Sequence, residues 1–387
     1  IRLRRRRVPR PARRRKPRLP VPAARWVARR APLRKLRRRR MQRPWEPNPR
    51  RTSRNSRAAV GQGVATRFTW TARGWAAAPL GLAFLLAGCG GDRAFPPAGT
   101  DPVLFTHVAR IRGFDPARSG DVASILAMAK VYEGLLQYDY THRPYRVEPA
   151  LAEALPEVSS DGLTYTFHLR ADARFHDDPC FAATGGRGRA VTAADVVYSI
   201  QRVADARNSA PGFWVFRDRI AGLDEFRAQS SAGTATDYTR PIAGLRALDE
   251  RTLRIGLIRP YPQLLWVLAM QYAYVVPPEA VRYYGEGFAE HPVGTGPYWL
   301  ASWRRNYRME YVRNPTWHGE PGLARPQIER IVQYVMDDPT TRWLTFLNGQ
   351  LDLYSDIARD TWDTVMTPAG EFNPELRRQG LVLDRLV

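Results

Sequence analysis

Cysteine is scarce in this 387-residue chain, and the ligand patterns of metal enzymes are missing from it. There are two cysteines, Cys89 and Cys180, and the six histidines are scattered without the paired spacing of a zinc site. The G-x-S-x-G elbow and the S-x-x-K motif of serine hydrolases do not occur. We therefore expect no metal, no cofactor and no catalytic residue.

Long hydrophobic runs are also lacking. The apolar run Trp75–Ala87 is shorter than the roughly 20 residues of a transmembrane helix, but it suits the core of a secretory signal, with Arg67 and Arg73 as the basic flank. It ends in Leu86-Ala87-Gly88-Cys89, a lipoprotein signal in which Cys89 becomes the lipidated N-terminus. This pattern predicts a protein lipid-anchored on the extracytoplasmic (periplasmic) face of a membrane. A buried apolar helix ending at Gly88 is the alternative.

Acidic residues are almost missing from the N-terminal region. Residues 1–57 hold 25 Lys and Arg against the single acid Glu46, whereas the whole chain carries +23, so residues 58–387 are nearly neutral. Such an Arg/Pro-rich composition cannot bury apolar surface, which predicts disorder over 1–63. Because an export signal at 64–89 works near a true N-terminus, we interpret 1–63 as upstream sequence that is not translated. The alternative is an arm that binds nucleic acid by neutralising phosphates.

The remaining sequence indicates an α/β domain after a Gly/Pro-rich tether at 90–100, because strand-like and helix-like segments alternate along it. The expected elements are a strand at 103–109, a helix at 121–136, a strand at 163–169, a helix opened by the capping box Thr192–Asp195, a strand at 252–258, a hairpin at 296–313 and a helix at 339–348 ending before Gly349.

Several polar positions allow two interpretations. Gly294-Thr295-Gly296 suits a tight turn with a scaffold role, since glycine accepts positive φ, and lacks the features of a phosphate cradle. Glu133, expected in mid-helix, is either a ligand carboxylate or, as we favour, part of a surface ion pair. Asp177 and Asp178 are either an acid–base pair or, as we favour, a solvated turn. Cys180 is expected in the core.

Aromatic residues gather at Pro211–Phe216 and Met270–Tyr274. Rings with polar tips give a rigid contact area for varied ligands, which makes Trp214 and Tyr272 candidate binding residues. Core packing is the alternative for these residues.

The chain resembles the bacterial extracellular solute-binding proteins of family 5, which serve peptide and nickel ABC importers. The resemblance spans about residues 101–366 and rests on segments in the family's order. These are Gly113–Pro116, Val131–Leu135, Pro149–Glu153, Asp161–Phe167, Arg174–Pro179, Val191–Ser199, Gly294–Tyr298 and Thr340–Asp352.

The resemblance implies a periplasmic-binding-protein-like fold (type II, class C) with two lobes that close over a ligand. Residues 101–355 would form lobe I with its smaller subdomain and 356–387 the start of a truncated lobe II. It implies a non-enzymatic lipoprotein that captures peptides, or a similar small solute, and delivers them to an ABC permease. It also implies that Phe114, Tyr132 and Trp214 line the cleft, and it suggests no nucleic-acid partner. The alternatives are an exported hydrolase using Asp177 or Asp178 and a nucleic-acid-binding protein acting through the arginine-rich arm.

Overall fold

The computed structural model describes residues 2–5, 103–140, 142–231, 235–320, 323, 325–355 and 357–384. These residues form two hydrophobic clusters. The main cluster draws on residues 108–331, and the second cluster combines Leu3 with residues 343–381. In the described ranges, no helix has the length and apolar character needed to cross a membrane. The expected signal at 64–89, with Cys89, and the tether at 90–100 lie outside the described residues.

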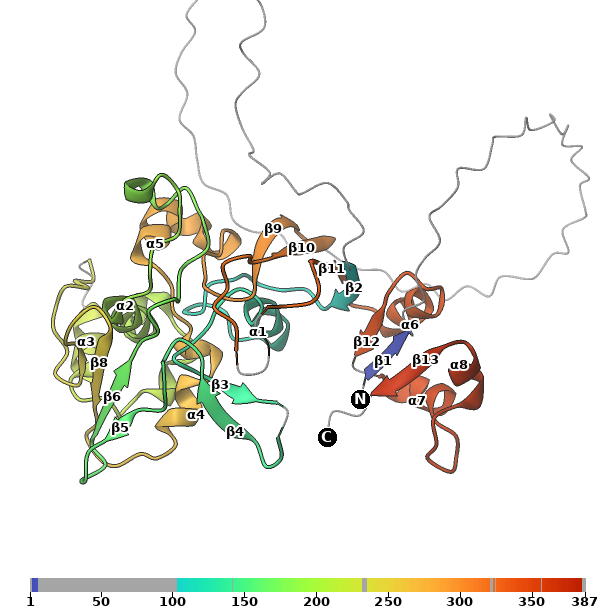
Figure 1. Cartoon of the computed structure of the whole chain (residues 1–387), viewed down its shortest axis with the longest axis horizontal. Coiled ribbons are helices and arrows are strands. Elements are labelled where there is room, and N and C mark those ends of the chain that lie inside the picture. Colours follow the sequence, from blue (N-terminus) through green and yellow to red (C-terminus); the bar gives the residue numbers. More distant parts are fainter. Residues whose placement is uncertain are drawn as a thin grey trace, which may run out of the picture. The chain divides into compact units, whose positions relative to one another are not determined.

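A four-stranded sheet contains both the first strand after the tether and the expected hairpin (Figure 1). Strand β2 (Val103–Val108) runs parallel to β11 (Arg330–Val335), and β11 pairs antiparallel with β10 (Arg308–Arg313). Strand β10 also pairs with β9 (Tyr298–Arg304) across a turn in which Asn306 has a φ of 56°. The predicted strand at 103–109 and the predicted hairpin are confirmed.

The second four-stranded sheet has the order β5-β6-β8-β7. Strand β6 (Thr164–His168) buries Tyr165 and Phe167 and pairs antiparallel with β8 (Thr252–Gly256). The short strands β5 (Glu157–Val158) and β7 (Leu245–Ala247) complete the sheet. The alternating patterns at 163–169 and 252–258 are therefore confirmed as half-buried strands.

Helix α2 (Ala193–Ala204) contacts β7 and β8 of this sheet. Its N-terminus carries the predicted capping box, in which the Asp195 carboxylate accepts a hydrogen bond from the Thr192 backbone N–H. Val196, Ile200 and Val203 form its buried stripe. The sequence prediction of this helix is confirmed.

Shorter elements complete the part of the chain between β2 and β9. They are the hairpin strands β3 (Leu136–Asp139) and β4 (Arg146–Pro149), the helices α3 (Leu223–Ser230), α4 (Leu264–Leu268) and α5 (Pro278–Tyr284), and the 3₁₀ helices η1 (Ala182–Thr184), η2 (Ala206–Asn208), η3 (Phe213–Val215), η4 (Gln271–Ala273) and η5 (Gly285–Glu290).

The helix predicted over 121–136 is only half correct. Helix α1 (Val122–Met128) begins at the N-cap Asp121 and ends far earlier than expected. Beyond it, the Val131 carbonyl accepts from the Gly296 N–H at 2.9 Å and the Lys130 carbonyl accepts from the Tyr298 N–H at 3.0 Å. The carbonyl groups of Lys130 and Val131 therefore bond to residues 296–298 instead of accepting hydrogen bonds within a continued helix.

The second cluster is formed by the C-terminal elements. Helix α6 (Pro339–Leu347) is followed by Gly349 at a φ of 73°, which confirms the predicted helix and its terminating glycine. The other elements are β12 (Leu353–Ser355), α7 (Arg359–Val365), α8 (Pro374–Arg378) and β13 (Leu381–Asp384).

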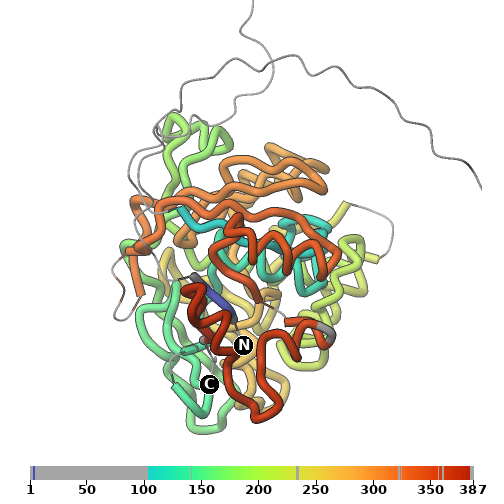
Figure 2. Tube along the Cα trace, turned by 90° about the vertical axis from the view of Figure 1, so that its right-hand side faces the viewer, coloured from blue at the N-terminus to red at the C-terminus, as the bar shows by residue number. Residues whose placement is uncertain are grey.

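Strand β1 (Arg2–Arg5) corrects the expectation that all of 1–63 is disordered. It lies between β12 and β13 and pairs antiparallel with both, and Figure 2 shows it in blue among the red C-terminal segments. Leu3 is fully buried in the second cluster. The Arg-rich composition gave no indication of this strand. Four residues are ordered here because β1 pairs with the edges of β12 and β13 and buries Leu3. The rest of 1–63 lies outside the described residues.

Candidate functional site

The two aromatic stretches singled out from the sequence lie side by side. A Cβ atom placed at Gly212 would come within 2.1 Å of the Tyr272 ring, and one at Gly120 within 2.7 Å of Pro211. Glycine at 120 and 212 therefore permits the close approach of three distant segments. We call this place, formed by Gly120, Pro211, Gly212 and Tyr272, the aromatic junction.

Apolar side chains remain exposed on the segments that meet at the junction. Trp214 on η3 is 63% exposed, whereas Tyr272 on η4 is 8% exposed and belongs to the main cluster. On α1, which starts two residues after Gly120, Val122 and Leu126 are one turn apart and are 72% and 50% exposed. Trp214 is thus available to a ligand, and Tyr272 supports its segment.

Phe114 and Tyr132 take other places. Phe114 is fully buried and packs edge-on against Trp303 at 5.5 Å between ring centroids, so its interpretation as a cleft residue is wrong for this structure. Its side chain has no surface left for a ligand, and core packing accounts for it. Tyr132 is 1% exposed, stacks on Tyr274 and borders a separate cavity.

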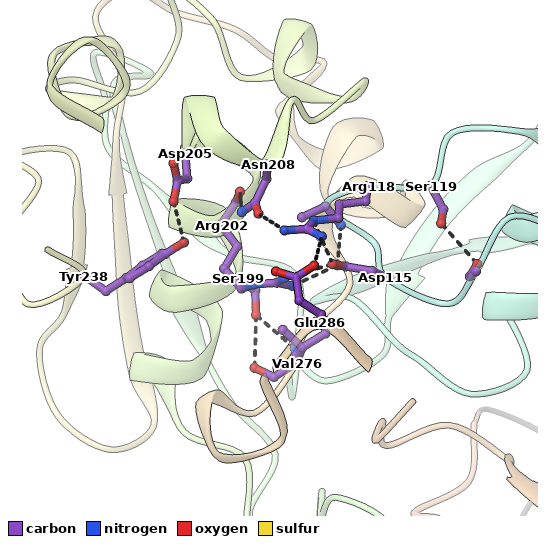
Figure 3. A network of polar contacts seen from close by, with 12 residues as sticks. Asp115, Arg118, Ser119, Ser199, Arg202, Asp205, Asn208, Tyr238, Val276 and Glu286 are labelled. Carbon is purple, nitrogen blue, oxygen red and sulfur yellow. Dashed lines mark hydrogen bonds and ion pairs between the residues drawn. The ribbon is translucent and has the colours of Figure 1, made fainter. Parts of the chain in front are cut away.

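A buried ion pair holds the first of the three segments in place (Figure 3). Arg202 of α2 donates from both terminal nitrogens to the two carboxylate oxygens of Asp115, each at 2.9 Å. Both residues are buried. Burial alone would lower the pKa of Arg202, but the Asp115 carboxylate outweighs it and raises that pKa. A bidentate pair of this kind fixes geometry as well as charge.

Further polar contacts extend from this pair to the neighbouring elements (Figure 3). Asn208 donates to the Arg202 carbonyl at 2.8 Å and accepts from Arg118 at 3.4 Å. Ser199 accepts from the Val276 N–H at 2.9 Å, which ties α2 to the chain just after η4. Helix α2 therefore positions both the 113–121 segment and the stretch that carries Tyr272.

Glu133 is neither in mid-helix nor in a surface ion pair, so both expectations were wrong. It is buried in the loop after α1, where its carboxylate accepts from Thr295 Oγ1 at 2.8 Å, Trp317 Nε1 at 3.0 Å and His318 Nε2 at 3.1 Å. Burial alone would lower the pKa of His318, but the bond to Glu133 raises it. Glu133 thus joins three segments that are distant in sequence.

The Gly294-Thr295-Gly296 segment has the expected scaffold role for a different reason. A Cβ at Gly294 would lie 2.0 Å from the Val131 carbonyl oxygen, and one at Gly296 would lie 2.8 Å from the Val131 carbonyl carbon. Close backbone approach therefore requires these glycines, rather than a positive φ. Buried His176 adds a contact from its Nε2 to the Gly296 carbonyl at 2.9 Å.

The expectation of a solvated turn at Asp177 and Asp178 holds only for Asp177, which is exposed. Asp178 is 2% exposed, accepts from the Cys180 N–H and from the Tyr284 hydroxyl, both at 2.9 Å, and so acts as a structural cap. Cys180 is buried as expected, and burial raises the pKa of its thiol. Across the described ranges, no three His, Cys, Asp or Glu side chains gather in a way that could hold a metal ion.

Solved structures share this arrangement of sheets and helices. A periplasmic oligopeptide-binding protein of Borrelia burgdorferi matches with a TM-score of 0.58 at 23% identity, over 68% of this chain and 49% of that one. The pheromone receptor PrgZ, whose structure shows its mode of peptide binding, matches with a TM-score of 0.54 at 25% identity, over 65% of this chain and 46% of that one. The molecule therefore has the α/β fold of the periplasmic binding proteins.

Sequence comparisons identify the family. Residues 146–377 match the bacterial extracellular solute-binding proteins, family 5 Middle, and the chain belongs to this family of transport binding proteins, which are not enzymes. The probable ABC transporter periplasmic-binding protein SapA of Escherichia coli is 31% identical over 63% of this chain, and the oligopeptide-binding protein OppA of E. coli is 28% identical over 70%. The chain spans 42% and 47% of the length of these two relatives.

Sequence reasoning missed the residues that hold the site together. Asp115 lies in the Gly113–Pro116 turn that the sequence had marked, but its partner Arg202 is 87 positions away. The sequence offered no local signal for this pair, because at helical spacing Arg202 lies on the side of Asp195 and Ser199, away from the apolar stripe of α2.

Proposed function

We propose that this chain belongs to the extracytoplasmic solute receptor of an ABC transporter, which captures peptides or a similar small solute and passes them to the permease. The observation that carries the proposal is the family match over 146–377, joined to the fold of proteins whose names state oligopeptide or peptide binding. Periplasmic relatives support a place outside the cytoplasm.

The aromatic junction would supply one wall of the peptide site. Trp214 offers an exposed ring on a short segment that is held from below by Tyr272 and by the network of Arg202. A ring on a fixed support contacts varied side chains at low entropic cost. The wall would act together with a second lobe that closes by hinge motion.

We propose that the change from lobe I to lobe II falls at the start of α6 rather than at residue 356. The second cluster already includes Trp343 and Phe346 of this helix, so the apolar side chains of α6 pack with the C-terminal elements. Residues 101–338 would then belong to lobe I, and the chain from α6 onward would begin lobe II.

Calorimetric titration of the native protein with a panel of short peptides tests the proposal. We expect binding, and we expect Trp214→Ala to weaken it about tenfold because a large contact is lost. Tyr307→Ala, which removes a 51% exposed ring at the tip of the β9–β10 hairpin, is the matched control and should leave affinity unchanged. Absence of heat with every peptide, or equal losses in both variants, would contradict the proposal.

We also propose the lipid anchor at Cys89, on the strength of the signal pattern that precedes it. Cys89→Ala should abolish incorporation of labelled fatty acid in a bacterial host and leave the precursor uncleaved. The second cysteine provides the control, because Cys180→Ala removes a thiol from the folded core and should retain the label. Equal labelling of Cys89→Ala and the parent chain would rule out the anchor.

A further inference from the structure

A cavity separate from the aromatic junction opens on another part of the main cluster. It has a volume of about 520 Å³, which is within the range of small-molecule sites, and none of the residues of the aromatic junction lines it. Its walls come from the loop after α1, from β3, from the chain after η4, from the start of β9 and from the stretch around Trp317.

Aromatic rings dominate these walls. Six of them border the cavity: Tyr132, Tyr138, Tyr140, Tyr274, Tyr298 and Trp317. Several are fixed by contacts outside the cavity, because the Tyr138 hydroxyl donates to the Trp266 carbonyl at 3.2 Å and the Tyr298 hydroxyl donates to the Ile328 carbonyl at 3.0 Å. Trp317 is held by its indole N–H bond to Glu133 at 3.0 Å. These hydrogen bonds therefore hold three of the six rings in place at the cavity.

The charge of the lining is of one sign. Glu133 and Glu320 border the cavity, and no Lys, Arg or His is among the described residues that line it, although the chain holds 60 Lys and Arg. The Glu133 carboxylate is paired with His318 and serves to fix Trp317. The Glu320 carboxylate accepts from the Gln137 amide at 3.0 Å, a neutral donor, and no ion pair to Glu320 is seen among the residues that the structure describes.

We propose that this cavity binds a small organic cation, an alkylammonium or quaternary ammonium group, with its charge over the tyrosine and tryptophan faces and beside Glu320. Ring faces carry negative electrostatic potential and attract such cations, while a carboxylate at the rim adds direct attraction. An anion would find no basic group in the lining. The site is independent of the peptide-binding function proposed above.

Choline and its uncharged counterpart of the same shape, 3,3-dimethylbutan-1-ol, separate charge recognition from simple apolar filling. Calorimetric titration of the full chain should show choline binding at least about tenfold more tightly than the alcohol. Equal affinities would show an apolar pocket without cation recognition and would overturn the proposal, as would absence of binding by both.

Variants locate the site. Glu320→Gln should weaken choline binding about fivefold without changing the affinity for the alcohol, and Glu157→Gln, on exposed strand β5, should change neither. Tyr140 is 73% exposed, so Tyr140→Leu should weaken choline binding without loss of fold, and Tyr140→Phe should retain it. Trp214→Ala should leave choline binding intact, which separates this site from the peptide wall. An unchanged choline affinity in Glu320→Gln would refute the assignment.

Discussion

The two hydrophobic clusters are stabilised in different ways. All the buried polar and charged side chains among the described residues lie between Thr106 and Gln333, and His107 is one of them that packs against the second cluster, at 5.3 Å from the Tyr354 ring. The main cluster is crossed by ion pairs and hydrogen bonds such as Asp115–Arg202 and Glu133–His318. The second cluster is apolar and aromatic, with Trp343, Phe346 and Tyr354 in mutual contact.

This difference has a physical consequence. A buried polar pair specifies one arrangement, because any other leaves a charge without its partner in a medium of low polarity. An apolar cluster accepts any segment of the right size and pattern, and the second cluster accepts Leu3 from a strand that is distant in sequence. We infer that side-chain geometry is fixed at the aromatic junction and at the cavity lined by Tyr138 and Trp317, and is more adaptable in the second cluster.

The largest test of this comparison breaks the Asp115–Arg202 pair. Arg202→Met removes the bidentate partner of the buried Asp115 carboxylate, which keeps a longer contact to the half-exposed Arg118 at 3.8 Å and the Ala117 N–H at 3.0 Å. It should destabilise the main cluster by about 3–5 kcal/mol, whereas the double variant Asp115→Leu/Arg202→Met should recover part of the loss. Urea unfolding followed by segment-resolved hydrogen exchange measures both.

Arg110→Met is the matched control for that experiment. It removes an exposed ion pair with Asp337 and should cost less than about 1 kcal/mol. If Arg202→Met proved no more harmful than Arg110→Met, the main cluster would not depend on its buried charges and the comparison would fail.

A smaller effect is expected from the second cluster. In the full 387-residue chain, purified before any cleavage at Cys89 could remove β1, Leu3→Ala opens a cavity among aromatic side chains and should cost about 2–4 kcal/mol, seen as faster hydrogen exchange in β12 and β13 with no change in β9 and β10. Leu155→Ala, at a site 50% exposed, should change neither region. Unchanged exchange in β12 and β13 would show that β1 does not contribute to this cluster.

Local patterns predicted the local structure well. The capping box of α2, the alternation in β6 and β8, the β9–β10 hairpin and the glycine after α6 each lie within about a dozen residues, so short-range physics determines them. The same reasoning made Trp214 and Tyr272 candidate ligand residues, and Gly212, two positions before Trp214, lies against the Tyr272 ring. Their contact with a ligand stays a prediction.

Contacts between distant segments could not be predicted in this way. The predicted helix at 121–136 failed because Lys130 and Val131 bond to a loop more than 160 residues later. Glu133 was misplaced with it, since its partners Thr295 and His318 come from that loop and beyond. Phe114 has the chemistry of a ligand contact, but only its packing against Trp303 shows that it belongs to the core.

The third test uses pH, because His318 joins the buried polar set of the main cluster and residues 343–381 contain no histidine. Glu133, Arg170 and Asp172 are the charged groups that act on or around His318, and the net effect raises the pKa of His318 above its ordinary 6.5. A raised folded-state pKa means that its stabilisation is complete below about pH 6.5 and is lost as pH rises through the folded-state pKa. The main cluster should therefore resist urea better at about pH 6 than at about pH 8, while exchange in β13, corrected for its intrinsic rate, stays constant. Strand β12 does not serve as a reference, because its Ser355 N–H donates to His107 Nε2 at 3.3 Å. His318→Gln should flatten this dependence, and His142→Gln, which alters a histidine whose side chain is 58% exposed, should leave it as it is. A pH dependence that survived His318→Gln would assign the effect to another group and remove this buried pair from the account of the main cluster.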